Sequence, residues 1–231
     1  ANQLLAHALD KKNTEDYIEA EQYLKSLLAI APDNLQANRM LPEISMYLKK
    51  TQQINDIVLS VERLMTELGE QAETIAAPKK SALAEYNQRE YGRLRLWQGL
   101  NELQFQRTNN AKKILQDAEN IIKTARDWLY LGYVSEAQGH LYRSTKQYSV
   151  AKNYYQTAIA NHRIIKCPFG EVNNLLNLAE NAYLQANYAD AKLQVDKAYN
   201  LAKKRELNSL LEEAKVAKEK YNLSSSSAQV Q

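Results

Sequence analysis

The sequence is poor in the residues that form tight turns and interrupt helices. Its 231 residues include six glycines and four prolines, which leaves few positions for the connections of a β-sheet. Alanine, leucine, lysine, glutamate and glutamine, all good helix formers, dominate instead. The composition therefore predicts an all-α protein.

Cysteine and histidine are scarce as well. Cys167 is the single cysteine, which excludes an intramolecular disulfide and a metal site built from several cysteines. The three histidines, His7, His140 and His162, are far apart in the sequence and do not make a ligand set. We expect no metal and no cofactor.

Long apolar runs are missing. No stretch approaches the roughly 18 consecutive apolar residues of a membrane span, which predicts a soluble domain, so a membrane anchor would have to lie outside this chain. The chain begins at Ala1 without a basic and apolar leader, and we expect a processed form or a fragment of a longer protein. The compartment, cytoplasmic or periplasmic, and the oligomeric state stay open.

Neither sign of charge is in large excess. The chain has 30 Lys and Arg against 27 Asp and Glu, a net charge of +3. The basic groups around Arg93 and Lys203 are accompanied by carboxylates such as Glu90 and Glu206, which favours solvated helix faces. We therefore expect no direct nucleic-acid binding by this chain.

Catalytic motifs are absent from the sequence. It has no glycine-rich phosphate loop, no His-Glu-x-x-His helix and no nucleophile elbow. Glutamates scattered over helix faces are the usual solubilising pattern. The sequence predicts a protein that is not an enzyme.

What the sequence does contain is an internal repeat. Ala111, Ala151 and Ala191 stand 40 residues apart. Each has a small residue twelve positions before it, a large apolar residue four positions after it and an alanine seven positions after it. Two close-packing points per unit, on two helices, predict a helix hairpin, and such hairpins stack to bury their apolar faces. In the three copies the residues are Gly99, Leu115 and Ala118, then Gly139, Tyr155 and Ala158, then Ala179, Val195 and Ala198.

This pattern resembles the tetratricopeptide repeat (TPR) family, in which a small residue on the first helix meets an alanine, a large apolar residue and a second alanine on the second. Residues 84–202 carry the resemblance well, residues 1–34 carry one further unit, and residues 35–83 carry it poorly. The resemblance implies a right-handed α-solenoid of stacked antiparallel hairpins with a C-terminal capping helix. A standard TPR unit has about 34 residues. The 40-residue units here are similar to the TPR modules of bacterial transcription regulators and signalling proteins.

The pattern divides the chain into five parts. A hinge is expected at Pro78, because proline breaks helices. Pro42 either kinks a helix or begins one as a first-turn residue. The predicted parts are irregular hairpins over 1–75, a hinge or linker over 76–83, three long repeats over 84–205, a capping helix over 206–222 and a disordered tail over 223–231.

The resemblance also implies a binding site, because the first helix of each hairpin lines the concave surface in the resembled fold. Asparagine can bind backbone amides there and arginine can bind carboxylates. The simpler interpretation is that both residues are common on any exposed helix, and the family's Lys and Asn clamp for a terminal carboxylate is not reproduced. Counting from the alanines, the candidate groove residues are Arg93, Trp97, Tyr133, Glu136, His140, Arg143, Asn173, Asn177 and Glu180.

The sequence therefore predicts a protein–protein interaction scaffold for a protein or peptide partner. The unit length favours the regulatory or sensory domain of a bacterial transcription regulator or signalling protein, with its output domain outside this chain. The alternative is a receptor for a small molecule or short peptide held in the concave groove. A purely structural assembly scaffold is the third hypothesis.

Overall fold

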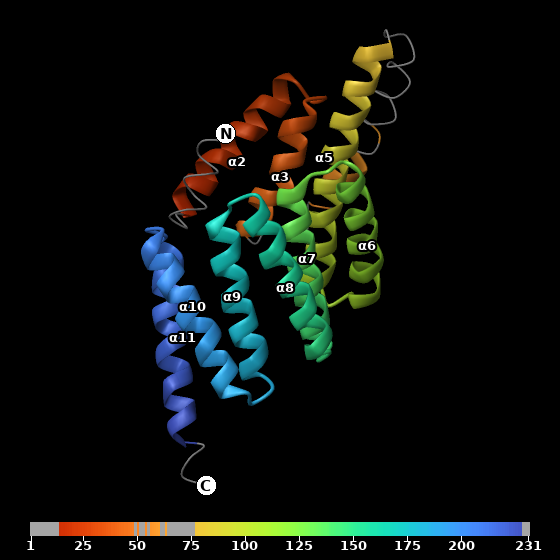
Figure 1. The fold of residues 1–231 in the computed structure, drawn as a ribbon. Coiled ribbons are helices and arrows are strands. Elements are labelled where there is room, and N and C mark those ends of the chain that lie inside the picture. Colours follow the sequence, from red (N-terminus) through yellow and green to blue (C-terminus); the bar gives the residue numbers. More distant parts are fainter. Residues whose placement is uncertain are drawn as a thin grey trace. The chain divides into compact units, whose positions relative to one another are not determined.

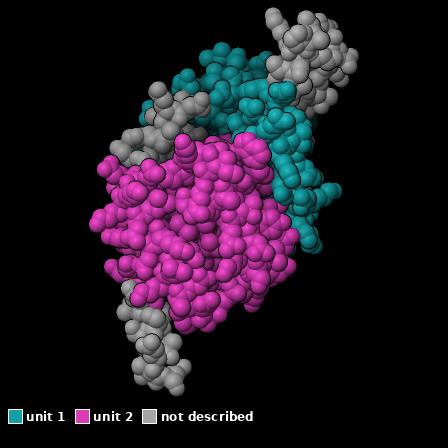
Figure 2. Space-filling model, in the orientation of Figure 1, with its two compact units in different colours: residues 1–127 teal, residues 128–231 magenta. Residues whose placement is uncertain are grey.

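The computed structural model describes residues 14–48, 50, 54, 56–60, 63 and 77–227. These residues form nine helices and no strand. The chain divides into two compact units, Ala1–Asp127 and Trp128–Gln231 (Figure 2). The helices of unit 1 are α2 (Thr14–Ile30), α3 (Leu35–Tyr47), α5 (Ala77–Gln104) and α6 (Thr108–Thr124), and those of unit 2 are α7 (Trp128–Ser144), α8 (Tyr148–Ile164), α9 (Pro168–Tyr183), α10 (Tyr188–Lys204) and α11 (Asn208–Ser227) (Figure 1).

Within each unit, the described helices pack against their neighbours along the chain. In unit 2, α7 pairs with α8 and α9 pairs with α10, while α11 covers α10 and also touches α9 (Figure 1). In unit 1, α2 packs on α3, α3 on α5, and α5 on α6. The predicted fold class is confirmed: this is an all-α, TPR-like solenoid of antiparallel helix hairpins.

The predicted small residues allow paired helices to approach closely. A Cβ atom on Gly99 would lie 2.5 Å from Leu115 Cδ2, and one on Gly139 would overlap the Tyr155 ring. Leu115 and Tyr155 are fully buried, so they have no free space into which to move. Glycine is therefore needed at both positions for the helices to pack.

A second set of close contacts was not predicted. A Cβ on Gly92 would lie 2.7 Å from Ile122 Cγ1, and one on Gly132 would lie 2.6 Å from His162 Cε1. Gly92 and Gly132 are again 40 residues apart, and so are Ile122 and His162. Each of these hairpins therefore has two close contacts, which are seven residues apart along each helix.

The six turns from α5 to α11 share one backbone conformation that recurs every 20 residues. Each turn contains one non-glycine residue with a φ of 54–59° and ends the preceding helix in a Schellman motif. In one example, Ala186 N–H donates to Tyr183 O at 2.9 Å and Asn187 N–H donates to Ala182 O at 3.0 Å. The 40-residue unit therefore consists of two halves, each a helix and a three-residue turn. The left-handed residues are Gln106, Arg126, Lys146, Lys166, Ala186 and Glu206.

The observed boundaries differ from the predicted ones at the hinge and the tail. Helix α5 begins at Ala77 and has Pro78 in its first turn, where proline is tolerated because the first N–H groups of a helix have no partner within it. Most of the predicted hinge is therefore helical, and the boundary between the units follows Asp127 instead. At the other end, α11 continues to Ser227, into the predicted tail.

Part of the predicted N-terminal region lies outside the described residues, namely 1–13 and most of 49–76. Pro42, for which two interpretations were open, lies inside α3. Across the ranges that the structure describes, no helix has both the length and the hydrophobicity that crossing a membrane requires.

Replacing Ala186 by glycine is expected to stabilise unit 2 by about 0.5–1 kcal/mol, because a left-handed φ crowds the Cβ of an L residue. The matched change Ala160→Gly removes the same methyl group from an exposed position in α8. It is expected to destabilise the unit by about 1 kcal/mol. Denaturant unfolding followed by circular dichroism measures both effects, and a shift of the same sign in the two variants would contradict the left-handed turn.

Candidate functional site

The polar residues of α7 and α9 in unit 2 form one connected row. The residues on each helix are three or four positions apart, so they share one helix face. Helices α7 and α9 are in contact. The row comprises seven of the predicted groove residues: Tyr133, Glu136, His140 and Arg143 on α7, and Asn173, Asn177 and Glu180 on α9. We call it the polar row.

Glu136 joins the two helices of the polar row. Its carboxylate oxygens accept hydrogen bonds from the Asn173 amide at 2.7 Å and from the Asn174 amide at 2.8 Å. His140 Nε2 lies 3.5 Å from the Asn173-bound oxygen. Burial would raise the pKa of Glu136, but the contacts with His140 and Asn174 outweigh it and hold the pKa below its usual value. The carboxylate is therefore ionised at neutral pH.

A second group of contacts surrounds Arg143. Its Nη1 donates to Glu180 at 2.6 Å, and its guanidinium carbon lies 5.7 Å from the centre of the Tyr155 ring. His140 Nδ1 lies 3.0 Å from the Tyr155 hydroxyl and 3.2 Å from Arg143 Nη2. Because a guanidinium only donates, Nδ1 is the acceptor. In this arrangement Nε2 is the ring nitrogen that donates, and it faces Glu136.

Some groups of the polar row stay accessible. The Glu180 side chain is 45% exposed and the His140 side chain 31%, whereas Glu136 is 15% exposed. The side-chain nitrogen of Asn177 is buried and has no hydrogen-bond partner among the described residues. A buried amide donor is unfavourable unless it is satisfied, so Asn177 is suited to binding an acceptor supplied from outside.

The two predicted site residues of unit 1 have internal roles. Arg93 pairs with Glu90 at 2.8 Å and with Asp127 at 2.7 Å. Glu90 also pairs with Arg39 of α3 at 2.7 Å and is almost fully buried. Trp97 is 8% exposed. Arg93 and Trp97 therefore hold α3, α5 and the turn after α6 together within unit 1.

Two contributors to the site were not among the predicted residues. Asn174 is fully buried and binds both Glu136 and the Gly170 carbonyl. Its neighbour Asn173 was predicted from its spacing to the repeat alanines. This spacing does not show how α9 is rotated about its axis, and therefore does not show which of its residues face α7. Tyr155 was predicted as a packing residue, and it is one, but its hydroxyl also holds His140.

His162 is the most unusual titratable group of unit 2. It is fully buried between Gly132 of α7 and Gly170 of α9, whose Cβ atoms would lie 2.6 Å and 2.5 Å from its ring. Neither ring nitrogen has a hydrogen-bond partner in the described part of the chain. Burial lowers the pKa of His162 and prevails over Glu136 and Glu171, which raise it. The ring is therefore neutral at neutral pH.

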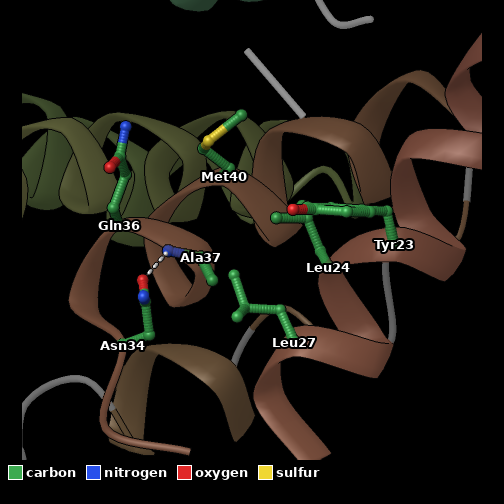
Figure 3. Close-up of a pocket in the computed structure, with 7 residues that line it drawn as sticks. All are labelled: Tyr23, Leu24, Leu27, Asn34, Gln36, Ala37 and Met40. Atoms are coloured by element: carbon green, nitrogen blue, oxygen red, sulfur yellow. Dashed lines mark hydrogen bonds between the residues drawn. The ribbon is translucent and has the colours of Figure 1, made fainter. Parts of the chain in front are cut away.

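Unit 1 has a small pocket of about 180 Å³ between α2 and α3 (Figure 3). Its lining combines polar and apolar groups. The Asn34 side chain at its edge is already engaged, since it accepts a hydrogen bond from Ala37 N–H at 2.9 Å. The pocket could hold one apolar side chain or a small ligand. It is lined by Tyr23, Leu24, Leu27, Asn34, Gln36, Ala37 and Met40.

The chemistry available in the polar row is hydrogen bonding and ion pairing. It offers amide groups, a guanidinium and two carboxylates, which suit backbone amides and charged side chains. Within the described ranges, no group of three or more His, Cys, Asp or Glu side chains is placed to hold a metal ion.

Comparison with known proteins bears on the fold. No family model matches the chain, and no curated protein matches it. The crystal structure of BtubC (BKLC) from P. vanneervenii is similar, with a TM-score of 0.55 over 95% of this chain and 92% of that one, at 9% identity. A tetratricopeptide repeat protein from Parabacteroides merdae ATCC 43184 aligns over 92% of this chain and 98% of that one at 15% identity, with a TM-score of 0.25. The similarity to BtubC concerns the fold alone, and the second match is too distant to support an argument.

His162 is expected to make unit 2 less stable in acid. Because its pKa is lower in the folded state than the ordinary 6.5, the unfolded chain binds a proton first as the pH falls. Its contribution to stability is full above about pH 6.5 and is lost below it, by at most about 1.4 kcal/mol per pH unit.

The measurement is the free energy of unfolding between about pH 7.5 and pH 5.5 for the natural chain and for His162→Ile, which copies the residue at the equivalent Ile122. The variant should show a smaller decrease. An equal decrease in both proteins would show that His162 is not the group responsible.

Proposed function

We propose that the protein is a scaffold that binds a partner polypeptide, and that the polar row of unit 2 is the binding site. The observation that carries this proposal is that side chains of the polar row are held in fixed positions while some of them stay exposed to solvent. Glu136, Arg143 and His140 are held in place by one another and by α9 and Tyr155. Side chains that are already ordered lose little entropy when a partner binds.

The partner that suits this row is an extended segment with a basic side chain. The Asn177 nitrogen is buried and unpaired among the described residues of the free chain, and it can donate to a backbone carbonyl of the segment when its side chain turns outward. Glu180 is more exposed than Arg143, with 45% of its side chain accessible against 19%. The charge presented to a partner is therefore mainly negative, and it attracts Lys or Arg.

The more specific proposal is that this scaffold is the regulatory or sensory domain of a bacterial transcription regulator or signalling protein. The 40-residue units are similar to the TPR modules of bacterial transcription regulators and signalling proteins, and this similarity is its support. In this form the chain is the regulatory or sensory part, and an output domain lies outside it. The reading frame of the native gene provides the test: a DNA-binding or signalling domain in the same frame supports the regulatory role, and a frame without one contradicts it.

The alternative function is a receptor for a small molecule. The pocket of about 180 Å³ in unit 1 favours this alternative, because its mixed polar and apolar lining would accept a small ligand. A small ligand that binds the native state raises the melting temperature as its concentration increases. Such a rise, produced by a small compound and absent with peptides, would favour the receptor over the scaffold.

Peptides selected on the immobilised protein from a random display library test the polar row directly. We expect basic residues to be enriched among them. The double change Asn177→Ala and Glu180→Ala is expected to weaken binding of the selected peptides at least tenfold, about 1.4 kcal/mol, because it removes the exposed Glu180 carboxylate and the unpaired Asn177 amide. Isothermal titration calorimetry measures the dissociation constants.

The matched control is Asn153→Ala with Glu219→Ala, which makes the same chemical changes at exposed positions on α8 and α11. It should bind like the natural chain. Equal affinity of both double variants, each folded by circular dichroism, would locate peptide binding elsewhere.

A further inference from the structure

One end of unit 2 combines basic and exposed apolar side chains. The contact between Gly132 and His162 sets the register of the antiparallel pair α7 and α8, and it places Trp128 beside the end of α8. The turns from α8 to α9 and from α10 to α11 lie at this same end (Figure 1). We call it the basic end. Its defining residues are Trp128, Ile164, Lys166, Lys203, Lys204 and Arg205.

The helices that form the basic end have nearly equal lengths. Helices α7 to α10 have 16 or 17 residues each, and the turns at this end have the same left-handed conformation. Packed helices lie about 8–10 Å apart, so the ends of these four helices span roughly 20–30 Å.

The charge of this end is not neutralised within unit 2. Arg163 is paired with Glu171 at 2.7 Å, and Glu206 is an exposed carboxylate in the last turn. The remaining cations are exposed and form no ion pair with the described residues. They are Lys166, Lys203, Lys204 and Arg205. Cations near helix C-termini interact well with the helix dipole, but this effect does not account for the apolar groups beside them.

Ile164 and Trp128 are the apolar groups of the basic end. Ile164 is 68% exposed, the highest value among the large apolar side chains described in unit 2, and Trp128 is 44% exposed. Ile164 stands two residues before Lys166. Aliphatic and tryptophan side chains next to Lys and Arg suit the boundary between lipid headgroups and acyl chains.

We propose that the basic end of unit 2 binds the surface of an anionic lipid bilayer. Lys166, Lys203, Lys204 and Arg205 face the headgroups, and Ile164 and Trp128 enter the interfacial layer. A nucleic acid would use the cations, but an isoleucine cannot stack on bases as aromatic side chains do. An acidic polypeptide would have to place an apolar side chain opposite Ile164, whereas a bilayer offers acyl chains at every position beside its headgroups. This site is separate from the polar row and does not depend on it.

Sedimentation of the full chain with vesicles tests the proposal. The vesicles contain phosphatidylcholine alone or phosphatidylcholine with phosphatidylserine. We expect binding only to the second kind, and weaker binding at about 1 M salt, where the Debye length falls to about 3 Å. Exchanging Lys203, Lys204 and Arg205 for glutamine together should lower the partition coefficient roughly a hundredfold, about fivefold for each cation. Ile164→Ser should lower it about fivefold while keeping the charge.

The matched control exchanges Lys146, Lys192 and Lys197 for glutamine, which changes the net charge equally at exposed positions of unit 2 outside the basic end. It should change the partition coefficient less than about threefold. Circular dichroism confirms that all variants are folded.

Three results would overturn the proposal. The first is no binding to the anionic vesicles, and the second is an equal loss in the two triple variants. The third is displacement of the protein from vesicles by single-stranded DNA or polyglutamate at matched charge, because the basic end would then recognise polyanions of another class.

Discussion

The fold depends on contact between a small residue on one helix and a bulky residue on its partner. Leu115 and Tyr155 fill the space that Gly99 and Gly139 leave, and Ile122 and His162 fill the space beside Gly92 and Gly132. In the last hairpin the sizes at the second contact are exchanged. The larger residue, Val172, is on the first helix, α9, and the small residue, Ala202, is on the second helix, α10, and both belong to one core. The combined size of each pair is limited because the interior is close-packed. This limit sets how near the helices approach and therefore where their side chains lie.

The same contacts position the polar row. Tyr155 fills the slot beside Gly139, and its hydroxyl reaches His140 one residue further along α7. His162 fills the slot between Gly132 and Gly170 and lies near Glu136. Packing residues thus support the charged groups, and a change in the helix spacing would separate Glu136 and Arg143 from their partners on α9.

The 40-residue spacing of the alanines was sufficient to predict the hairpins and the cap position. The signal for the second packing level was also present, because Gly92 and Gly132 keep the same spacing, but it was not recognised. The turns could not be predicted in the same way. Their left-handed positions are occupied by residues such as Lys146 and Lys166, whereas glycine is the residue that normally signals this conformation.

Helix periodicity predicted which residues of the polar row share a helix face, but not which residues they contact on the other helix. Spacing placed Glu136, His140 and Arg143 on one face, but contacts across helices depend on how each helix is rotated. Asn174 was missed for that reason. In unit 1 the same limit applied to Arg93, because its ion-pair network extends through Glu90 to Arg39, 54 positions earlier in the sequence.

A double-mutant cycle at Gly139 and Tyr155 is the most direct test of the packing constraint. Gly139→Ala is expected to destabilise unit 2 by about 1–3 kcal/mol, because the added methyl group meets the Tyr155 ring. Tyr155→Val also destabilises the unit, but it opens space for that methyl group and copies the Ala179 and Val195 pair. The double variant should therefore be at least about 1 kcal/mol more stable than the sum of the single effects. Effects that add within about 0.5 kcal/mol would contradict the constraint.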